Sequence, residues 1–316
     1  MEKIAINTLT FAVCPLSNQE CEWMKDDLDF RAIHKASKLY MIAQRKEIRF
    51  KNVALNDSQK AISFDLECGD EVIPDVKLPV DQFMSDEIDA LKVEVGEKMI
   101  RIRVDESGKN LDDCKIIMWL TPDRIFTFFS RGWLSVHGLN EYRRFTTFKL
   151  HYVGISKAHD SFTRLFENGH ESRSRILGNE YQMTPTARLT DELMIFMFEV
   201  EALQIQSLGN NDTDVDDSAF DITQLDCSAL AADAEKAFVK ILNAEYNLEK
   251  YSNYPRGIDG LFGIGLARYS FVINECYTFE TTTASIKGAK FYDFNVSDQP
   301  DLVFIEGERV ALVKAT

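Results

Sequence analysis

Two short stretches, about eighty residues apart, constrain the fold of this chain most strongly. The first, LHYVGIS at residues 150–156, predicts a strand that runs into a glycine turn, followed by a helix with Arg164 near its beginning. The second, residues 233–247, predicts an amphipathic helix with Glu235 at its start and Asn247 just after its end. Side chains of these types can place a proton acceptor, a phosphate-binding cation and a metal ligand around one phosphodiester.

The pattern of apolar residues changes along the chain. Residues 1–135 are mostly of the strand type, with one helix predicted at 29–45 and an acidic, turn-rich stretch at 68–94. The predicted strands of this region, judged from alternation and from β-branched or aromatic content, are 4–13, 47–55, 61–67, 98–104, 115–120 and 124–130.

The middle region, residues 136–257, predicts a different order of elements. In chain order they are a hairpin of 142–148 and 149–155, a helix from 161 to 180, a buried strand at 192–205 and a helix at 231–242. Antiparallel strands with helices packed against them form an α+β unit. The fold class predicted is therefore α+β, with a small antiparallel sheet flanked by helices, framed by β-rich N- and C-terminal regions.

The last residues, 258–316, predict strands again. They fall at 267–279 and 290–295 and in a terminal hairpin of 301–305 and 310–314. These strands either pack with the N-terminal strands into one β-rich body or extend the sheet of the middle region. We therefore expect three domains: a β-rich domain at 1–135 that selects substrate or partner, a central domain at 136–257 with an acidic loop at 207–228, and a β-rich extension at 258–316.

The central region resembles the GIY-YIG nuclease superfamily, which contains the N-terminal nuclease of the bacterial excision-repair excinuclease and several homing and restriction endonucleases. The resemblance rests on Tyr152 in the YVG turn, on Arg164, on Glu235 and on the sequence AEYN that ends at Asn247. Tyr142, ten residues before Tyr152, stands near the position of the first tyrosine of the superfamily, but Asn-Glu-Tyr replaces Gly-Ile-Tyr there. The resemblance covers residues 140–255, about a third of the chain.

The resemblance implies a role for each of these residues. Tyr152 or Tyr142 helps to deprotonate water while the other hydrogen-bonds within the site, and Arg164 binds the phosphate, for which its planar guanidinium is suited. Glu235 is the ligand of Mg²⁺ (or Mn²⁺), because one carboxylate can hold such a cation together with waters and phosphate oxygens. The alternatives are an ordinary strand tyrosine, a surface arginine and a carboxylate that is favourable at a helix start.

Four further residues are expected beside the scissile phosphate. His170, six residues after Arg164, is expected to act as acid, base or phosphate ligand; the alternative is a histidine on a helix surface. Lys157, Arg173 and Asn247 are expected to bind substrate, Asn247 more by bracing the backbone than by direct contact. His151 and His159 flank the site and are weaker candidates.

The net charge of the chain argues against a nucleic-acid enzyme, whereas the local distribution of charge argues for one. A net charge of −15 is unfavourable, because phosphate binding depends on Lys and Arg. Residues 142–188, however, carry eight basic and four acidic groups. Residues 189–235 carry twelve carboxylates and no Lys or Arg. This acidic block is either a solvated surface or a phosphate mimic that screens the cleft until a partner displaces it.

The acidic loop does not match a calcium-binding loop. Counting from Asp212, Asp217 stands where an EF-hand needs Gly, and Thr223 stands where it needs Glu. The six cysteines are scattered without a CxxC pair, which argues against a zinc site or disulfides and for a cytoplasmic protein. No apolar run approaches the ~20 residues of a membrane helix, so we expect no membrane association.

These patterns together predict a soluble, metal-dependent endonuclease. DNA is favoured over RNA by analogy with the superfamily, and a role in restriction or phage defence is inferred by the same analogy. The alternative is a non-catalytic binding protein that keeps the scaffold and contacts another protein through its acidic surface. Mg²⁺-dependent cleavage of plasmid and of single-stranded substrates distinguishes the two.

Overall fold

The computed structural model describes residues 2–56, 60–106, 108–157, 160–167, 169–207, 225–290 and 298–315. They form two compact units. Unit 1 comprises Met1–Arg45, Thr147–Tyr181 and Arg188–Thr316, and unit 2 comprises Lys46–Thr146 and Gln182–Ala187. Unit 2 is thus inserted, along the chain, between segments of unit 1. The boundaries expected near residues 135 and 257 do not coincide with these.

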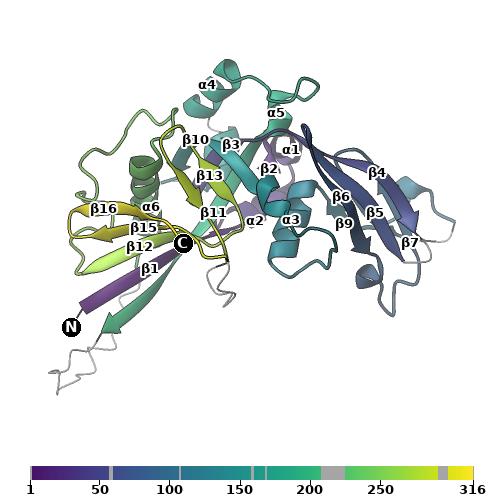
Figure 1. The fold of residues 1–316 in the computed structure, drawn as a ribbon, viewed down its shortest axis with the longest axis horizontal. Helices are drawn as coiled ribbons and strands as arrows, with labels where there is room; N and C mark the ends of the chain where they lie inside the picture. The colour runs from purple at the N-terminus through teal and green to yellow at the C-terminus, as the bar shows by residue number, and fades with distance from the viewer. Residues whose placement is uncertain are drawn as a thin grey trace. The chain divides into compact units, whose positions relative to one another are not determined.

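Unit 1 is built on one mixed sheet, which has ten strands within the described residues (Figure 1). The strands pair in the order β14-β13-β10-β3-β11-β1-β12-β15-β16, and β2 pairs with β11. Neighbours are antiparallel except for β1 with β12 and β10 with β13. The bounds are β1 (Glu2–Phe11), β2 (Leu16–Ser17), β3 (Leu39–Gln44), β10 (Thr147–Ile155), β11 (Leu193–Ser207), β12 (Arg268–Ile273), β13 (Thr278–Glu280), β14 (Ser285–Lys287), β15 (Leu302–Glu306) and β16 (Arg309–Val313).

The centre of this sheet is apolar and covered on both faces. All six residues of β3 are buried, as are residues 193–198 of β11. A strand covered on both faces reads as a nearly continuous apolar run, which is the pattern that both strands show. Helix α6 (Cys227–Leu242) packs against the sheet, and its Ala234 and Phe238 share a core with Phe196 of β11.

The sheet curves until its two edge strands approach each other. Lys314, which follows β16, donates to the Ser285 hydroxyl of β14 at 3.1 Å and to the Asp301 carboxylate at 3.0 Å. Helix α6 contacts β10, β3 and β11 and also β15 and β16, so it lies on the concave side of the curved sheet. The N-terminal, middle and C-terminal segments of the chain therefore share one core.

The other helices of unit 1 are short. They are α1 (Asn18–Met24), α2 (Leu28–His34), the π-helical turn η4 (Thr163–Glu167), α4 (Glu171–Asn179) and α5 (Leu189–Glu192). Side chains cap the first amide groups of several of them: the Asp27 carboxylate caps α2, and the His170 ring caps α4. Among the described residues, no helix is long and apolar enough to cross a membrane.

Unit 2 has its own core. Its described residues form two three-stranded antiparallel sheets, β4-β5-β6 and β7-β8-β9. Alternation places Ile62, Phe64 and Leu66 of β5 in the core, together with Phe126 of α3. The bounds are β4 (Ile48–Asn56), β5 (Ala61–Cys68), β6 (Glu71–Pro79), η1 (Asp81–Phe83), β7 (Leu91–Val95), β8 (Ile100–Val104), η2 (Leu111–Asp113), β9 (Ile116–Leu120), α3 (Pro122–Ser130) and η3 (Tyr142–Thr146).

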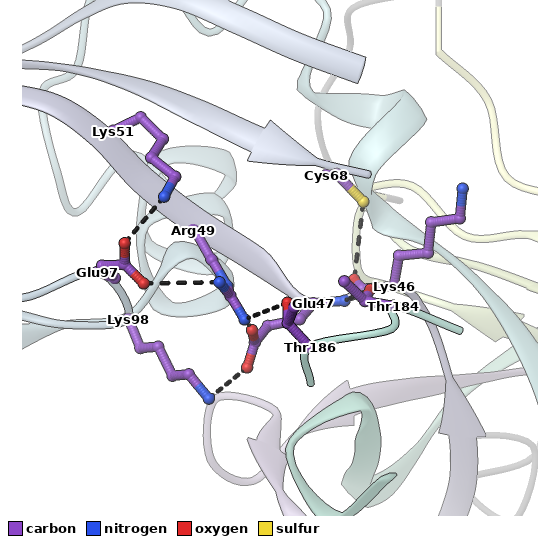
Figure 2. A network of polar contacts seen from close by, with 9 residues as sticks. All are labelled: Lys46, Glu47, Arg49, Lys51, Cys68, Glu97, Lys98, Thr184 and Thr186. Carbon is purple, nitrogen blue, oxygen red and sulfur yellow. Dashed lines mark hydrogen bonds and ion pairs between the residues drawn. The ribbon is translucent and has the colours of Figure 1, made fainter. Parts of the chain in front are cut away.

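A polar network attaches the short segment 182–187 to the rest of unit 2 (Figure 2). Arg49 donates to Glu47 at 2.6 Å and to the Thr186 hydroxyl at 3.1 Å, and the Glu47 amide donates to the Thr184 hydroxyl at 3.3 Å. The buried Glu47 carboxylate also pairs with Lys98. The carboxylate is shielded from water and meets two cations, which strengthens its ion pairs. The network therefore joins segment 182–187 to the first residues of unit 2.

The predicted fold class is wrong. Within the described residues, unit 1 contains neither a small antiparallel sheet flanked by helices nor separate β-rich frames on each side of it; strands from all three expected domains join one large mixed sheet (Figure 1). The two packings left open for the C-terminal strands are both realised, since β12 pairs with β1 and β13 pairs with β10. Pairing between distant strands is not encoded in local periodicity, which explains the error.

Three local predictions are also wrong. Residues 142–148 do not pair with β10, because 142–146 form a 3₁₀ helix. The helix predicted at 29–45 ends at His34, and β3 follows. The strand predicted at 124–130 is helix α3, which begins with Thr121 as its cap and Pro122 in its first turn. The acidic aspartates 212–217, His159 and most of the strand predicted at 290–295 lie outside the described residues.

Candidate active site

Tyr152 lies beside a second tyrosine, Tyr40, on the neighbouring strand. β10 pairs antiparallel with β3, and Gly154 stands opposite Tyr40, so Tyr152 is a diagonal neighbour of Tyr40. A Cβ atom at Gly154 would lie 2.8 Å from the Tyr40 hydroxyl and 2.9 Å from the Tyr152 hydroxyl. Both hydroxyl groups therefore occupy the space that a side chain would fill, and glycine is required there.

His170 completes an aromatic cluster with these two tyrosines. Its Nε2 lies 2.8 Å from the Tyr40 hydroxyl, and its ring centre lies 5.1 Å from that of Tyr152 in an edge-to-face arrangement. Burial lowers the pKa of His170 to about 4, and the positive charges of Arg164 and Arg173 act in the same direction. The imidazole is therefore neutral at pH 7.

Glu235 approaches the cluster from α6. Its side chain is 9% exposed, and the Tyr251 hydroxyl donates to its Oε2 at 3.1 Å. Burial raises the pKa of Glu235 to about 7, against the opposing effects of the Tyr251 hydrogen bond and of Lys157 and Lys236. The prediction that Glu235 begins a helix is wrong, because α6 begins at Cys227 and Glu235 lies in its middle. Burial, not the helix terminus, sets the properties of this carboxylate.

The negative charge of Glu235 influences the pKa of Tyr152. Burial raises the pKa of Tyr152, and the Glu235 charge is the next largest cause. Hydrogen bonds with Ser172 and Tyr40 and the charge of Arg164 lower it. The charges of Arg164, from η4, and of Glu235, from α6, therefore both act on Tyr152 of β10.

Arg164 and Lys157 form the exposed side of the site. Arg164 is exposed, and its guanidinium has no hydrogen-bond or ion-pair partner within the described part of the chain. Lys157 is also exposed and pairs with Asp259 at 3.3 Å; Lys236 pairs with the same carboxylate. The site thus has a buried floor and, on its exposed side, the guanidinium of Arg164 without a partner among the described residues, which suits an anionic ligand.

Asn247 braces the strand that carries Tyr152. Its side-chain amide donates to the Val153 carbonyl at 2.7 Å, and its carbonyl accepts from the Val153 amide at 3.0 Å. The Tyr246 amide also donates to the His151 carbonyl at 3.1 Å. The segment after α6 therefore fixes the backbone on both sides of Tyr152.

A cavity of about 180 Å³ is lined in part by Tyr251, the residue that bonds to Glu235. Its lining also includes two cations, Lys236 and Arg256. Both already have carboxylate partners, Asp259 and Glu308 respectively. The cavity therefore offers little uncompensated positive charge to a ligand.

Two of the predicted site residues have other roles in the structure. Tyr142 belongs to unit 2, where its ring stacks on Phe126 at 5.8 Å and meets Phe129 edge-to-face at 5.4 Å. Arg173 uses its guanidinium to bind Asn18 at 2.6 Å and Glu22 at 2.5 Å, which ties α4 to α1. The Tyr142 ring thus packs in the core of unit 2, whereas the Arg173 charge, although paired with Glu22, still acts on His170.

His151 belongs to a separate buried cluster. Its Nε2 bonds to the Gln44 side chain at 3.0 Å, and its Nδ1 lies 3.8 Å from the Glu180 carboxylate. Lys149 and Tyr246 both donate to Glu180, at 2.9 and 2.8 Å. Burial lowers the pKa of His151 to about 4, so the pair is not an ion pair at pH 7. These contacts attach β10 to the C-terminal end of α4.

Sequence reasoning missed Tyr40, Ser172 and Tyr251. Tyr40 lies on a strand that sequence periodicity assigns to the end of a helix, because apolar residues from Ala32 onward fit a helical spacing. The insertion of unit 2 separates β3 from β10 by about a hundred residues, so the proximity of the two tyrosines has no local signal. Tyr251 lies in the loop after α6, for which periodicity makes no prediction.

A divalent cation at this site would have the Glu235 carboxylate as its protein ligand. Among the described residues no group of three His, Cys, Asp or Glu side chains could hold a metal ion. One carboxylate is enough for Mg²⁺ or Mn²⁺ when waters and phosphate oxygens supply the remaining ligands. The buried charge of Glu235 also lacks full compensation, which favours a cation. The donor set thus fits a cation that arrives with its substrate.

Comparison with known proteins gives no match: no family model, curated protein or solved structure is significantly similar to this chain.

Proposed function

We propose that this protein is a metal-dependent endonuclease that hydrolyses phosphodiester bonds, with DNA as its substrate. One observation supports the proposal: the charges of Arg164 and Glu235, from two other elements of unit 1, both act on Tyr152, which lies beside the buried Tyr40–His170 pair. A proton acceptor, a guanidinium and a carboxylate in one site are the groups that phosphodiester hydrolysis needs.

Each side chain has a role that follows from its surroundings. Tyr152 accepts the proton of the attacking water, because its oxygen receives hydrogen bonds from Tyr40 and Ser172 that favour the phenolate. Arg164, exposed at the rim, binds two phosphate oxygens and stabilises the charge that develops on them. Glu235 would hold the cation, which when bound supplies positive charge at the phosphate.

Glu235 and Tyr152 are electrostatically linked in this scheme. The Glu235 charge raises the pKa of Tyr152, so neutralising that charge brings the phenol closer to ionisation. The Tyr152 phenolate is therefore scarcely populated when Glu235 is ionised and alone, and it is populated more when that charge is compensated. This coupling would explain why cleavage requires a metal although the site offers one carboxylate and not a cluster of them.

Cleavage of supercoiled plasmid and of single-stranded DNA with Mg²⁺ or Mn²⁺, against EDTA, tests the proposal. Arg164→Ala should reduce cleavage by about 10²- to 10³-fold, because it removes a group that stabilises transition-state charge. Arg309→Ala is the matched control, since Arg309 is exposed on the edge strand β16 of the same unit. If folded protein cuts neither substrate with either metal, the proposal fails and a non-catalytic binding protein is the better interpretation.

A further inference from the structure

His170 has a fixed position for its proton. It caps α4, and its Nδ1 accepts a hydrogen bond from the Arg173 backbone amide at 3.0 Å. A backbone amide can only donate, so Nδ1 carries no hydrogen. The ring is 3% exposed and neutral at pH 7, so its one proton resides on Nε2.

The Nε2 proton determines the direction of the next hydrogen bond. Nε2 lies 2.8 Å from the Tyr40 hydroxyl, so His170 donates and the Tyr40 oxygen accepts. The proton of Tyr40 must therefore point elsewhere. Tyr40 is hydrogen-bonded to Tyr152, and the two hydroxyl groups converge above Gly154, so Tyr40 donates to the Tyr152 oxygen.

We propose that His170 and Tyr40 form a one-way chain of donors that ends at the Tyr152 oxygen, so that both are positioning residues and Tyr152 is the group that exchanges a proton with water. Helix capping by His170 sets the direction of the whole chain. This inference rests on the proposed function for its catalytic meaning, but the hydrogen-bond directions can be measured without any activity. It also removes the role of general base from His170.

Charged and titratable groups surround Tyr152 on several sides. Glu235 acts from α6, Arg164 from η4, Tyr251 from the loop after α6, and Ser172 and His170 from α4. A change in any of them alters the ease with which Tyr152 ionises. The test must therefore isolate the Tyr40–Tyr152 bond from these other influences, and conservative substitutions within the chain achieve this.

NMR of the imidazole nitrogens in the parent protein tests the first link. We expect His170 at pH 7 to show a protonated Nε2 and an unprotonated Nδ1. A protonated Nδ1, or protonation of both nitrogens, overturns the proposal. This measurement needs no substrate and no variant, so it stands even if the protein cuts no DNA.

NMR of tyrosines labelled at Cζ tests the second link, the hydrogen bond from Tyr40 to Tyr152. The Tyr152 signal is identified as the one that is lost in Tyr152→Phe. Tyr40→Phe should raise the pKa of Tyr152 by about one to two pH units, because a donor to its oxygen is lost. His170→Asn, which can still cap α4, should have a smaller effect in the same direction. The control is Tyr246→Phe, whose hydroxyl donates to Glu180 in the separate His151 cluster. An unchanged Tyr152 pKa in Tyr40→Phe overturns the proposal.

Activity gives a third, independent readout. Tyr40→Phe should lower cleavage at neutral pH on the order of 10- to 100-fold, the effect of one hydrogen bond to a charged group, and the loss should shrink at higher pH. A loss that is equal at every pH means that Tyr40 is merely structural. If the NMR results hold but the parent protein cuts nothing, the donor chain stands and the proposed function fails.

Discussion

Glu235→Gln offers the sharpest test of the electrostatics of the site. The folded protein raises the pKa of this carboxyl from 4.5 to about 7, so between these values it binds the proton more tightly than the unfolded chain does. The free energy of unfolding must therefore fall as pH rises through this range. The difference corresponds to at most about 3 kcal/mol, at about 1.4 kcal/mol for each tenfold change in proton affinity.

Glutamine keeps the shape of the side chain and an oxygen for the Tyr251 hydroxyl, but it carries no charge. The variant should match the parent in stability at pH 4, below the ordinary pKa of 4.5, and exceed it by up to about 3 kcal/mol at pH 8 in EDTA. Urea unfolding followed by hydrogen exchange of the α6 amides measures this for unit 1 alone. Glu245→Gln is the control, because it removes an equal charge from an exposed position after the same helix.

Magnesium provides the second half of this test. A cation that binds the folded parent stabilises it by about 1.4 kcal/mol when its free concentration is tenfold above the dissociation constant, and it should not stabilise Glu235→Gln. The same variant should lose about 10²-fold or more in cleavage although it is more stable. Equal pH dependence in parent and variant would refute the claim that Glu235 is a desolvated carboxylate.

Three further substitutions probe the frame of the site. Gly154→Ala should destabilise unit 1 by about 1–3 kcal/mol and reduce cleavage, because the new methyl group meets the hydroxyls of Tyr40 and Tyr152; urea unfolding and plasmid cleavage measure the two effects. Asn247→Ala should cost about 2–4 kcal/mol in urea unfolding, since it leaves both backbone groups of Val153 without their buried partner. Tyr142→Phe should leave cleavage within about twofold of the parent, because the ring packs on Phe126 and Phe129 in unit 2; a large loss would restore Tyr142 to the site.

The sequence by itself determined the elements whose pattern is local. Strands β1, β5 and β11, helix α6 and the terminal hairpin of β15 and β16 are predicted close to their observed bounds. Each shows its own period of apolar residues or its own turn, and such signals need no partner elsewhere in the chain. Tyr152, Arg164 and Glu235 are selected differently, by residue type and by resemblance to the GIY-YIG superfamily.

The tertiary structure alone decided which residues meet. Tyr40 stands beside Tyr152, because β3 pairs with β10 although unit 2 separates the two strands along the chain. Strand pairing is fixed by the burial of whole faces and by contacts distant in sequence, so local spacing does not reveal this neighbour of Tyr152. The raised pKa of Glu235 has the same origin: its cause is burial, which arises when α6 packs against the sheet and is absent from the helix itself.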